Sequence, residues 1–140
     1  GGRVPPVVQS TIDKFPFSSD VNSSDVGEMS INRFNGTGQS SSTFGYNSGG
    51  EAPPLTNSID KFPFASDSNA TDVGELSSAR CGETGQSSSS FGYAVGGRAA
   101  PGRCDTIDKF PFAVDSSASD IGELTAIRQS GSGQQSGGNA

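Results

Sequence analysis

The stretch of sequence that decides the fold is Ile59-Asp60-Lys61-Phe62-Pro63-Phe64. Its apolar and polar residues come close to alternating, which is typical of a strand with one buried face, and Phe62 and Phe64 lie on the same side. Pro63 has no N–H group for a β-ladder, so it belongs at an edge, at a bulge or at the end of the strand. We therefore predict a short strand here.

The same six residues occur three times in the 140-residue chain, at 12–17, 59–64 and 107–112, with spacings of 47 and 48 residues. An Asp-Val/Ile-Gly-Glu motif, an arginine and a glutamine follow in each copy. Two copies close with Phe-Gly-Tyr and a double glycine. We predict three repeat units, at 1–50, 51–97 and, in shortened form, 98–130, followed by a flexible Gly/Ser/Gln tail at 131–140.

The pattern inside a unit predicts an all-β fold. Helical periodicity is missing, whereas Phe91-Gly92-Tyr93-Ala94-Val95 alternates cleanly and stops at a double glycine. The segment Asp67–Asp72 is rich in residues that form turns. We expect four short strands per unit. A single unit cannot bury its apolar face alone, so neighbouring units are needed for stability.

Composition excludes several classes of function. No apolar run approaches the roughly 18 residues of a membrane helix, so we expect no membrane insertion. Histidine is absent, which removes the commonest general base and metal ligand. The net charge of −6 argues against nucleic acid as a partner. We expect a non-enzymatic protein with no catalytic residues and no cofactor.

The residues expected to be structural are the repeated aromatics and arginines. They are Phe15, Phe17, Arg33, Tyr46, Phe62, Phe64, Arg80, Tyr93, Phe110, Phe112 and Arg128. The aromatic residues are expected in the core, with a sugar-binding surface as the alternative for Phe-Pro-Phe. Each arginine follows an aspartate by eight residues, which predicts an ion pair inside each unit. The predicted pairs are Asp25 with Arg33, Asp72 with Arg80 and Asp120 with Arg128.

Two features leave alternatives open. Asp67, Asn69, Asp72 and Glu75 have the oxygen density of a calcium loop, although their spacing differs from that of an EF-hand. A plain turn is the alternative. Cys81 and Cys104 could form one disulfide, or Cys81 could be a small buried apolar residue, since it replaces Phe34 of the first unit.

The order of features in a unit resembles the kelch repeat. Ile59–Phe62 stands at the first aromatic strand of that family, Arg80 at its arginine, and Tyr93–Gly97 at its closing strand and diglycine. The second aromatic of the family is missing, with Val73 or Leu76 in its neighbourhood. The resemblance implies four-stranded β-propeller blades. Three units would form an incomplete ring or an excerpt of a larger propeller.

The sequence of the unit, IDKFPF…TDVGEL…GQSSSSFGYAVGG, also resembles repeat proteins of marine and cyanobacterial tailed phages. Such proteins are regarded as structural or fibre components of the virion. This resemblance implies a virion or extracellular location and a structural or adhesive role. The implied partners are further repeat units, copies of the chain, other virion proteins and surface glycans. The alternative function is a carbohydrate-binding propeller that attaches to host cells.

Overall fold

The computed structural model describes residues 1–134, and these residues form β-strands and no helix. The all-β prediction is confirmed. Two small sheets are hairpins: β1 (Gly2–Val4) with β2 (Val7–Gln9), and β3 (Thr11–Lys14) with β4 (Ser24–Glu28). One four-stranded sheet contains β5 (Thr37–Ser40), β6 (Phe44–Ser48), β7 (Ser58–Pro63) and β8 (Thr71–Glu75). The other contains β9 (Thr84–Ser87), β10 (Phe91–Val95), β11 (Thr106–Pro111) and β12 (Ser119–Glu123).

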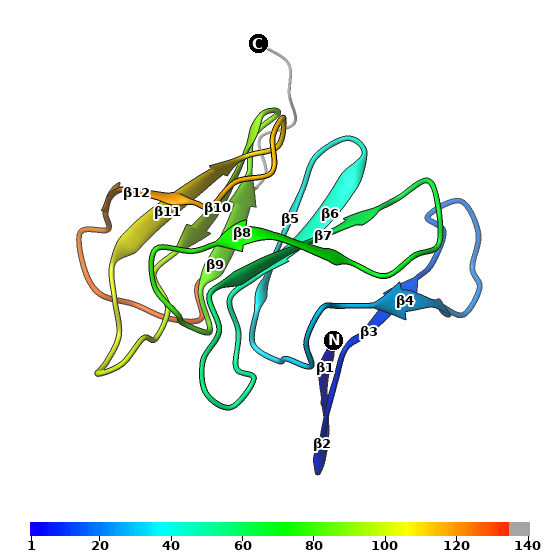
Figure 1. The fold of residues 1–140 in the computed structure, drawn as a ribbon, viewed down its shortest axis with the longest axis horizontal. Coiled ribbons are helices and arrows are strands. Elements are labelled where there is room, and N and C mark those ends of the chain that lie inside the picture. Colours follow the sequence, from blue (N-terminus) through cyan, green and yellow to red (C-terminus); the bar gives the residue numbers. More distant parts are fainter. Residues whose placement is uncertain (135–140) are drawn as a thin grey trace.

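Both four-stranded sheets are antiparallel meanders in which each strand pairs with the next one along the chain. Figure 1 shows β3–β4, β5–β8 and β9–β12 side by side, with the β1–β2 hairpin projecting from them. Strands β5 and β9 are in contact, so the two large sheets meet along the edges formed by these strands. We call this the inner edge of each sheet. In the described part of the chain no helix is long and apolar enough to cross a membrane.

The sheets are out of phase with the sequence repeat. In the first large sheet, β5 and β6 come from the unit at 1–50, whereas β7 and β8 come from the unit at 51–97. The four strands of the unit at 51–97 are therefore divided between two sheets. The β3–β4 hairpin corresponds to β7–β8 and β11–β12, but within residues 1–134 no strand pairs with the inner edge of β3. A unit completes a sheet only together with the unit before or after it.

The predicted strand at 59–64 is observed as β7, and Pro63 is its last residue. The register of β6 and β7 places Gly45 opposite Phe62, and the register of β10 and β11 places Gly92 opposite Phe110. The phenylalanine ring lies over each glycine, so that a Cβ atom on Gly92 would stand 2.4 Å from the Phe110 ring. The Phe-Gly-Tyr motif therefore needs glycine because an aromatic ring occupies the side-chain position.

The core lies between the two large sheets, and it contains fewer of the expected aromatics than the sequence predicts. Its buried cluster is Tyr46, Ile59, Leu76, Ala94 and Phe110. The prediction that Phe15 and Phe17 are core residues is wrong, since these side chains are 57% and 98% exposed. Phe64 is also 45% exposed. Phe110 lies over Gly92 of β10 and packs on Tyr46 of the preceding sheet. Among the described residues no hairpin pairs with the inner side of β3, so Phe15 has no glycine strand beside it and Phe64 has no tyrosine from the preceding sheet.

Candidate functional site: the contacts between successive units

One buried ion pair joins the first unit to the second, and an equivalent pair joins the second unit to the third. Arg33 Nη2 lies 2.8 Å from Asp60 Oδ2, and Arg80 Nη2 lies 2.9 Å from Asp108 Oδ2. All four side chains are at most 1% exposed. Each arginine precedes the innermost strand of a sheet, and each aspartate lies in the third strand of that sheet. The pair therefore fixes the connection between two sheets to the sheet that follows.

The carboxylates receive further hydrogen bonds, which is what a buried charge requires. The backbone N–H and the hydroxyl of Ser30 donate to Asp60 at 2.7 and 2.6 Å. The N–H and the hydroxyl of Ser77 both donate to Asp108 Oδ2, at 2.9 and 3.0 Å, and Asp108 Oδ1 has no hydrogen-bond partner among the described residues. Because each pair is embedded in this network, removal of one partner leaves an uncompensated buried charge, which costs about 3–5 kcal/mol.

This geometry corrects the predicted partner of each arginine. Asp25, Asp72 and Asp120 are exposed, and each accepts a hydrogen bond from the backbone N–H of the glycine two residues later in its strand, so none of them pairs with the arginine of its own unit. The aspartate that pairs with the arginine is the second residue of Ile-Asp-Lys-Phe-Pro-Phe in the next unit, and its side chain is fully buried. Arg128 is exposed, and its Nε donates only to the carbonyl of Ala126. Within residues 1–134 no aspartate of a following unit is present for it.

The acidic loop that suggested calcium binding is a contact between neighbouring sheets. Asp67 forms an ion pair with Lys14 of β3, and Asn69 Oδ1 accepts a hydrogen bond from the backbone N–H of Glu28 at 3.0 Å. Glu75 occupies the position of Glu28 in the next contact, where its N–H donates to Ser117. Across residues 1–134 no three acidic or cysteine side chains converge on a possible metal position.

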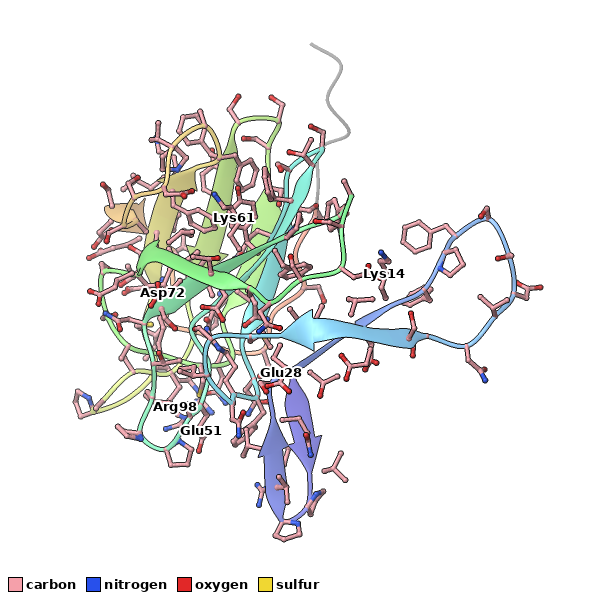
Figure 2. The ribbon with its side chains drawn as sticks, turned by 45° about the vertical axis from the view of Figure 1, so that its right-hand side comes forward. Lys14, Glu28, Glu51, Lys61, Asp72 and Arg98 are labelled. Carbon is pink, nitrogen blue, oxygen red and sulfur yellow. The ribbon has the colours of Figure 1, made fainter. Side chains whose placement is uncertain are left out.

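The same contact occurs twice along the chain. The Lys14–Asp67 ion pair between the first and second units is repeated as Lys61–Asp115 between the second and third. Figure 2 shows Lys14 between the β3–β4 hairpin and the connection from β7 to β8. Backbone bonds repeat too, since the N–H groups of Ala70 and Ala118 both donate to a glutamate carbonyl of the previous unit at 2.8 Å.

The glycine of the Asp-x-Gly-Glu motif is explained by this contact. A Cβ atom on Gly27 would stand 2.5 Å from the carbonyl oxygen of Ser68, and one on Gly74 would stand 2.6 Å from that of Ser116. The outer strand of one sheet and the turn of the next approach too closely for any side chain. Two motifs of the sequence repeat, Asp-x-Gly-Glu and the acidic turn, are therefore the two sides of one interface.

An aromatic contact supplements the polar ones. Tyr46 of β6 stacks on Phe112 with ring centroids 4.9 Å apart, and it contacts Phe110 at 5.6 Å. Burial raises the pKa of Tyr46. At the inner edge, Gln39 Nε2 donates to the carbonyl of Tyr93 at 3.0 Å, and the N–H of Ser40 donates to a serine hydroxyl of β9.

Glu83 is a buried residue that the sequence analysis did not single out. It is 6% exposed, and neither carboxylate oxygen has a hydrogen-bond partner among the described residues. Burial raises the pKa of Glu83 to about 8, although its own backbone N–H and the charges of Arg80 and Arg33 act in the opposite direction. The equivalent residues in the other units are Gly36 and Gly131, and this departure from the repeat is the signal that could have identified it.

Cys81 and Cys104 are not bonded to each other. Cys81 is 4% exposed, in agreement with the interpretation of a small buried residue. Burial raises the pKa of both thiols. Glu51 and Arg98 form an ion pair beside Cys81, and Figure 2 shows the two charged residues next to each other. Raised thiol pKa values disfavour the thiolate, so neither cysteine has the surroundings of a nucleophile.

No known protein family matches this chain, and no curated protein sequence is similar to it.

Proposed function

We propose that this protein is a non-enzymatic structural repeat module that assembles through strand and sheet packing. The observation that carries the proposal is that one contact set joins the first unit to the second and the second to the third. Because the contact is directional, an array built from it has two different ends that complement each other. We further propose that the sheets are kelch-like blades of an incomplete propeller, since each large sheet is a four-stranded meander.

The two ends of the molecule each present one half of the repeated contact. Lys109 is the counterpart of Lys14 and Lys61, and the described residues offer it no carboxylate at ion-pair distance. Asp20 is the counterpart of Asp67 and Asp115, and it is exposed and unpaired within residues 1–134. A second copy placed head to tail would bring Asp20 of one molecule to Lys109 of the other.

The proposed setting is a virion or another extracellular assembly, with a tail fibre or particle surface as the specific case. Its support is the resemblance of the repeated sequence to phage structural proteins. In that setting the partners are further units of this type, copies of the chain and other virion proteins. The acidic composition, rich in serine and glycine, is compatible with a structural protein whose strands are held together by backbone hydrogen bonds.

A charge exchange tests the proposed assembly. Native mass spectrometry and light scattering over a concentration series should show wild-type oligomers, and electron microscopy should show rings or stacks. Lys109→Glu and Asp20→Lys should each weaken association about tenfold, a typical effect of like charges in place of a pair. A mixture of the two variants should associate again, since each supplies the charge that the other lacks. A wild-type protein that stays a 14.2 kDa species at millimolar concentration would refute the proposal.

The alternative is carbohydrate binding for attachment to a host cell. It is favoured by one observation: Phe15 and Phe17 form an exposed edge-to-face pair with ring centroids 5.6 Å apart. Aromatic surfaces of this kind suit the apolar faces of sugar rings. A glycan array with wild type and Phe17→Ser would decide, because Phe17 is 98% exposed and its loss leaves the fold intact. Specific glycan binding that disappears in the variant would establish the alternative.

A further inference from the structure

Among the three equivalent strands β3, β7 and β11, β3 is the one that has no partner strand on its inner side within the described residues. In the two large sheets the equivalent strands, β7 and β11, pair on that side with β6 and β10. Strand β3 pairs only with β4. The carbonyl of Thr11 already accepts a hydrogen bond from Gly1. The other inner N–H and C=O groups of β3 are available to an added strand, and open edges of this kind bind extended peptides by strand addition.

A largely apolar cavity of about 600 Å³ lies beside this edge. It separates the β3–β4 hairpin from β7 of the next sheet. Its lining includes Ile12, Phe15, Phe17, Phe62 and Phe64. Phe17 and Phe64 line this cavity and are 98% and 45% exposed, whereas their counterpart Phe112 packs on Tyr46.

The two complete sheets show what fills the equivalent space. There a hairpin with Thr-Gly-Gln-Ser in one strand and Phe-Gly-Tyr in the other pairs with the motif strand. The phenylalanine of the hairpin lies opposite the proline, the glycine opposite the first phenylalanine, and the tyrosine opposite the lysine. The same register on β3 would put glycine under the ring of Phe15 and tyrosine opposite Lys14.

The tyrosine of such a hairpin would contact two phenylalanine rings that line the cavity. Tyr46 covers Phe110 and Phe112 of the adjacent sheet, and the equivalents of these two rings are Phe62 and Phe64. Both line the cavity. A tyrosine carried by the added strand would therefore stack on Phe64 as Tyr46 stacks on its own partner ring.

A charged residue of the site is also without its partner. Asp13 is the equivalent of Asp60 and Asp108, which bind Arg33 and Arg80. Asp13 is exposed, and no arginine or lysine of residues 1–134 forms an ion pair with it. An arginine four residues before the Thr-Gly-Gln-Ser strand would supply the missing charge.

We infer that the edge of β3 and the adjoining cavity are a docking site for a β-hairpin of the chain's own type, Arg-x₃-Thr-Gly-Gln-Ser-x₃-Phe-Gly-Tyr, supplied by a further repeat unit. The inference rests on the proposed function, because it takes the packing of repeat units as the basis of assembly. The end of the hairpin is also defined. The terminal ammonium group of Gly1 donates to the carbonyl of Thr11, as the N–H of Gly49 does to that of Ser58, so a docked hairpin pairs with β3 only beyond this carbonyl.

The test is calorimetric titration of the full-length protein with a synthetic peptide of residues 31–48. This peptide contains the arginine, both strands and no cysteine. The protein carries Asp20→Lys, so that head-to-tail association does not compete. We expect saturable binding of one peptide per chain. A peptide with Gly45→Val should bind at least tenfold more weakly, because its side chain would meet the ring of Phe15.

A double-mutant cycle examines the ion pair separately. The peptide with Arg33→Gln should lose about tenfold in affinity for the protein, but it should lose little against protein with Asp13→Asn. No saturable binding at millimolar peptide would overturn the inference, as would equal binding of the Gly45→Val peptide, since that would indicate unspecific attachment to an apolar cavity. Failure of the peptide with restored association in the charge exchange would refute the hairpin site and leave the proposed function standing.

Discussion

We predict that the buried carboxyl of Glu83 lowers the stability of this protein as the pH rises. Because its pKa in the folded protein is about 8 and its ordinary value is 4.5, the folded state holds a proton between these values that the unfolded chain has released. Stability that depends on this proton is fully present below pH 4.5 and is lost as the pH rises toward 8. The loss is roughly 1.4 kcal/mol for each pH unit, and roughly 5 kcal/mol over the whole window.

The perturbation is Glu83→Gln, which keeps the shape of the neutral carboxyl and removes its ionisation. Urea unfolding at pH 5, 6, 7 and 8 measures the free energy of unfolding of both proteins. The difference between variant and wild type should be small at pH 5 and should grow to roughly 4 kcal/mol in favour of the variant by pH 8. Other titrating groups contribute equally to both proteins, so the difference isolates this residue.

Glu75→Gln is the matched control, because this glutamate is exposed on β8. It should keep the pH dependence of the wild type. The reasoning about Glu83 is refuted if Glu83→Gln has the same dependence on pH as the wild type and the control. It is also refuted if the variant loses stability at pH 8, since the ionised carboxylate would then be a favourable partner of the nearby arginines.

Three further outcomes follow from the contacts between units. Arg80→Gln should lower the free energy of unfolding by about 3–5 kcal/mol because it leaves a buried aspartate unpaired, while Arg128→Gln should change it by less than about 0.5 kcal/mol in the same urea titration. Gly92→Val should destabilise by more than about 2 kcal/mol through its clash with an aromatic ring, whereas Gly102→Val, with nothing within 4 Å of a Cβ atom, should not; thermal melting distinguishes them. Cys81 should react with a soluble disulfide reagent at pH 8 at least tenfold more slowly in the folded than in the urea-unfolded protein, and equal rates would contradict its burial.

The candidate site was only partly predictable, and the arginines show why. The recurrence of arginine and aspartate in every unit indicated ion pairs, and Arg33 and Arg80 do form ion pairs, with other aspartates than those predicted. Their partners could not be read from spacing, since the nearest recurring aspartate lies in the same unit and the true partner lies in the next one. A pairing between units depends on how the sheets are offset from the repeat. No local pattern contains that information.

The sequence by itself determined that the chain is built of short strands and repeats every 47 or 48 residues, because alternation, turn residues and glycines act locally. Tertiary structure alone decided which aromatic rings are covered. Phe15 and Phe110 occupy the same place in their units, yet one is 57% exposed and the other 1%. Burial requires a neighbour on both sides, and only the arrangement of the sheets in space determines which strands have one.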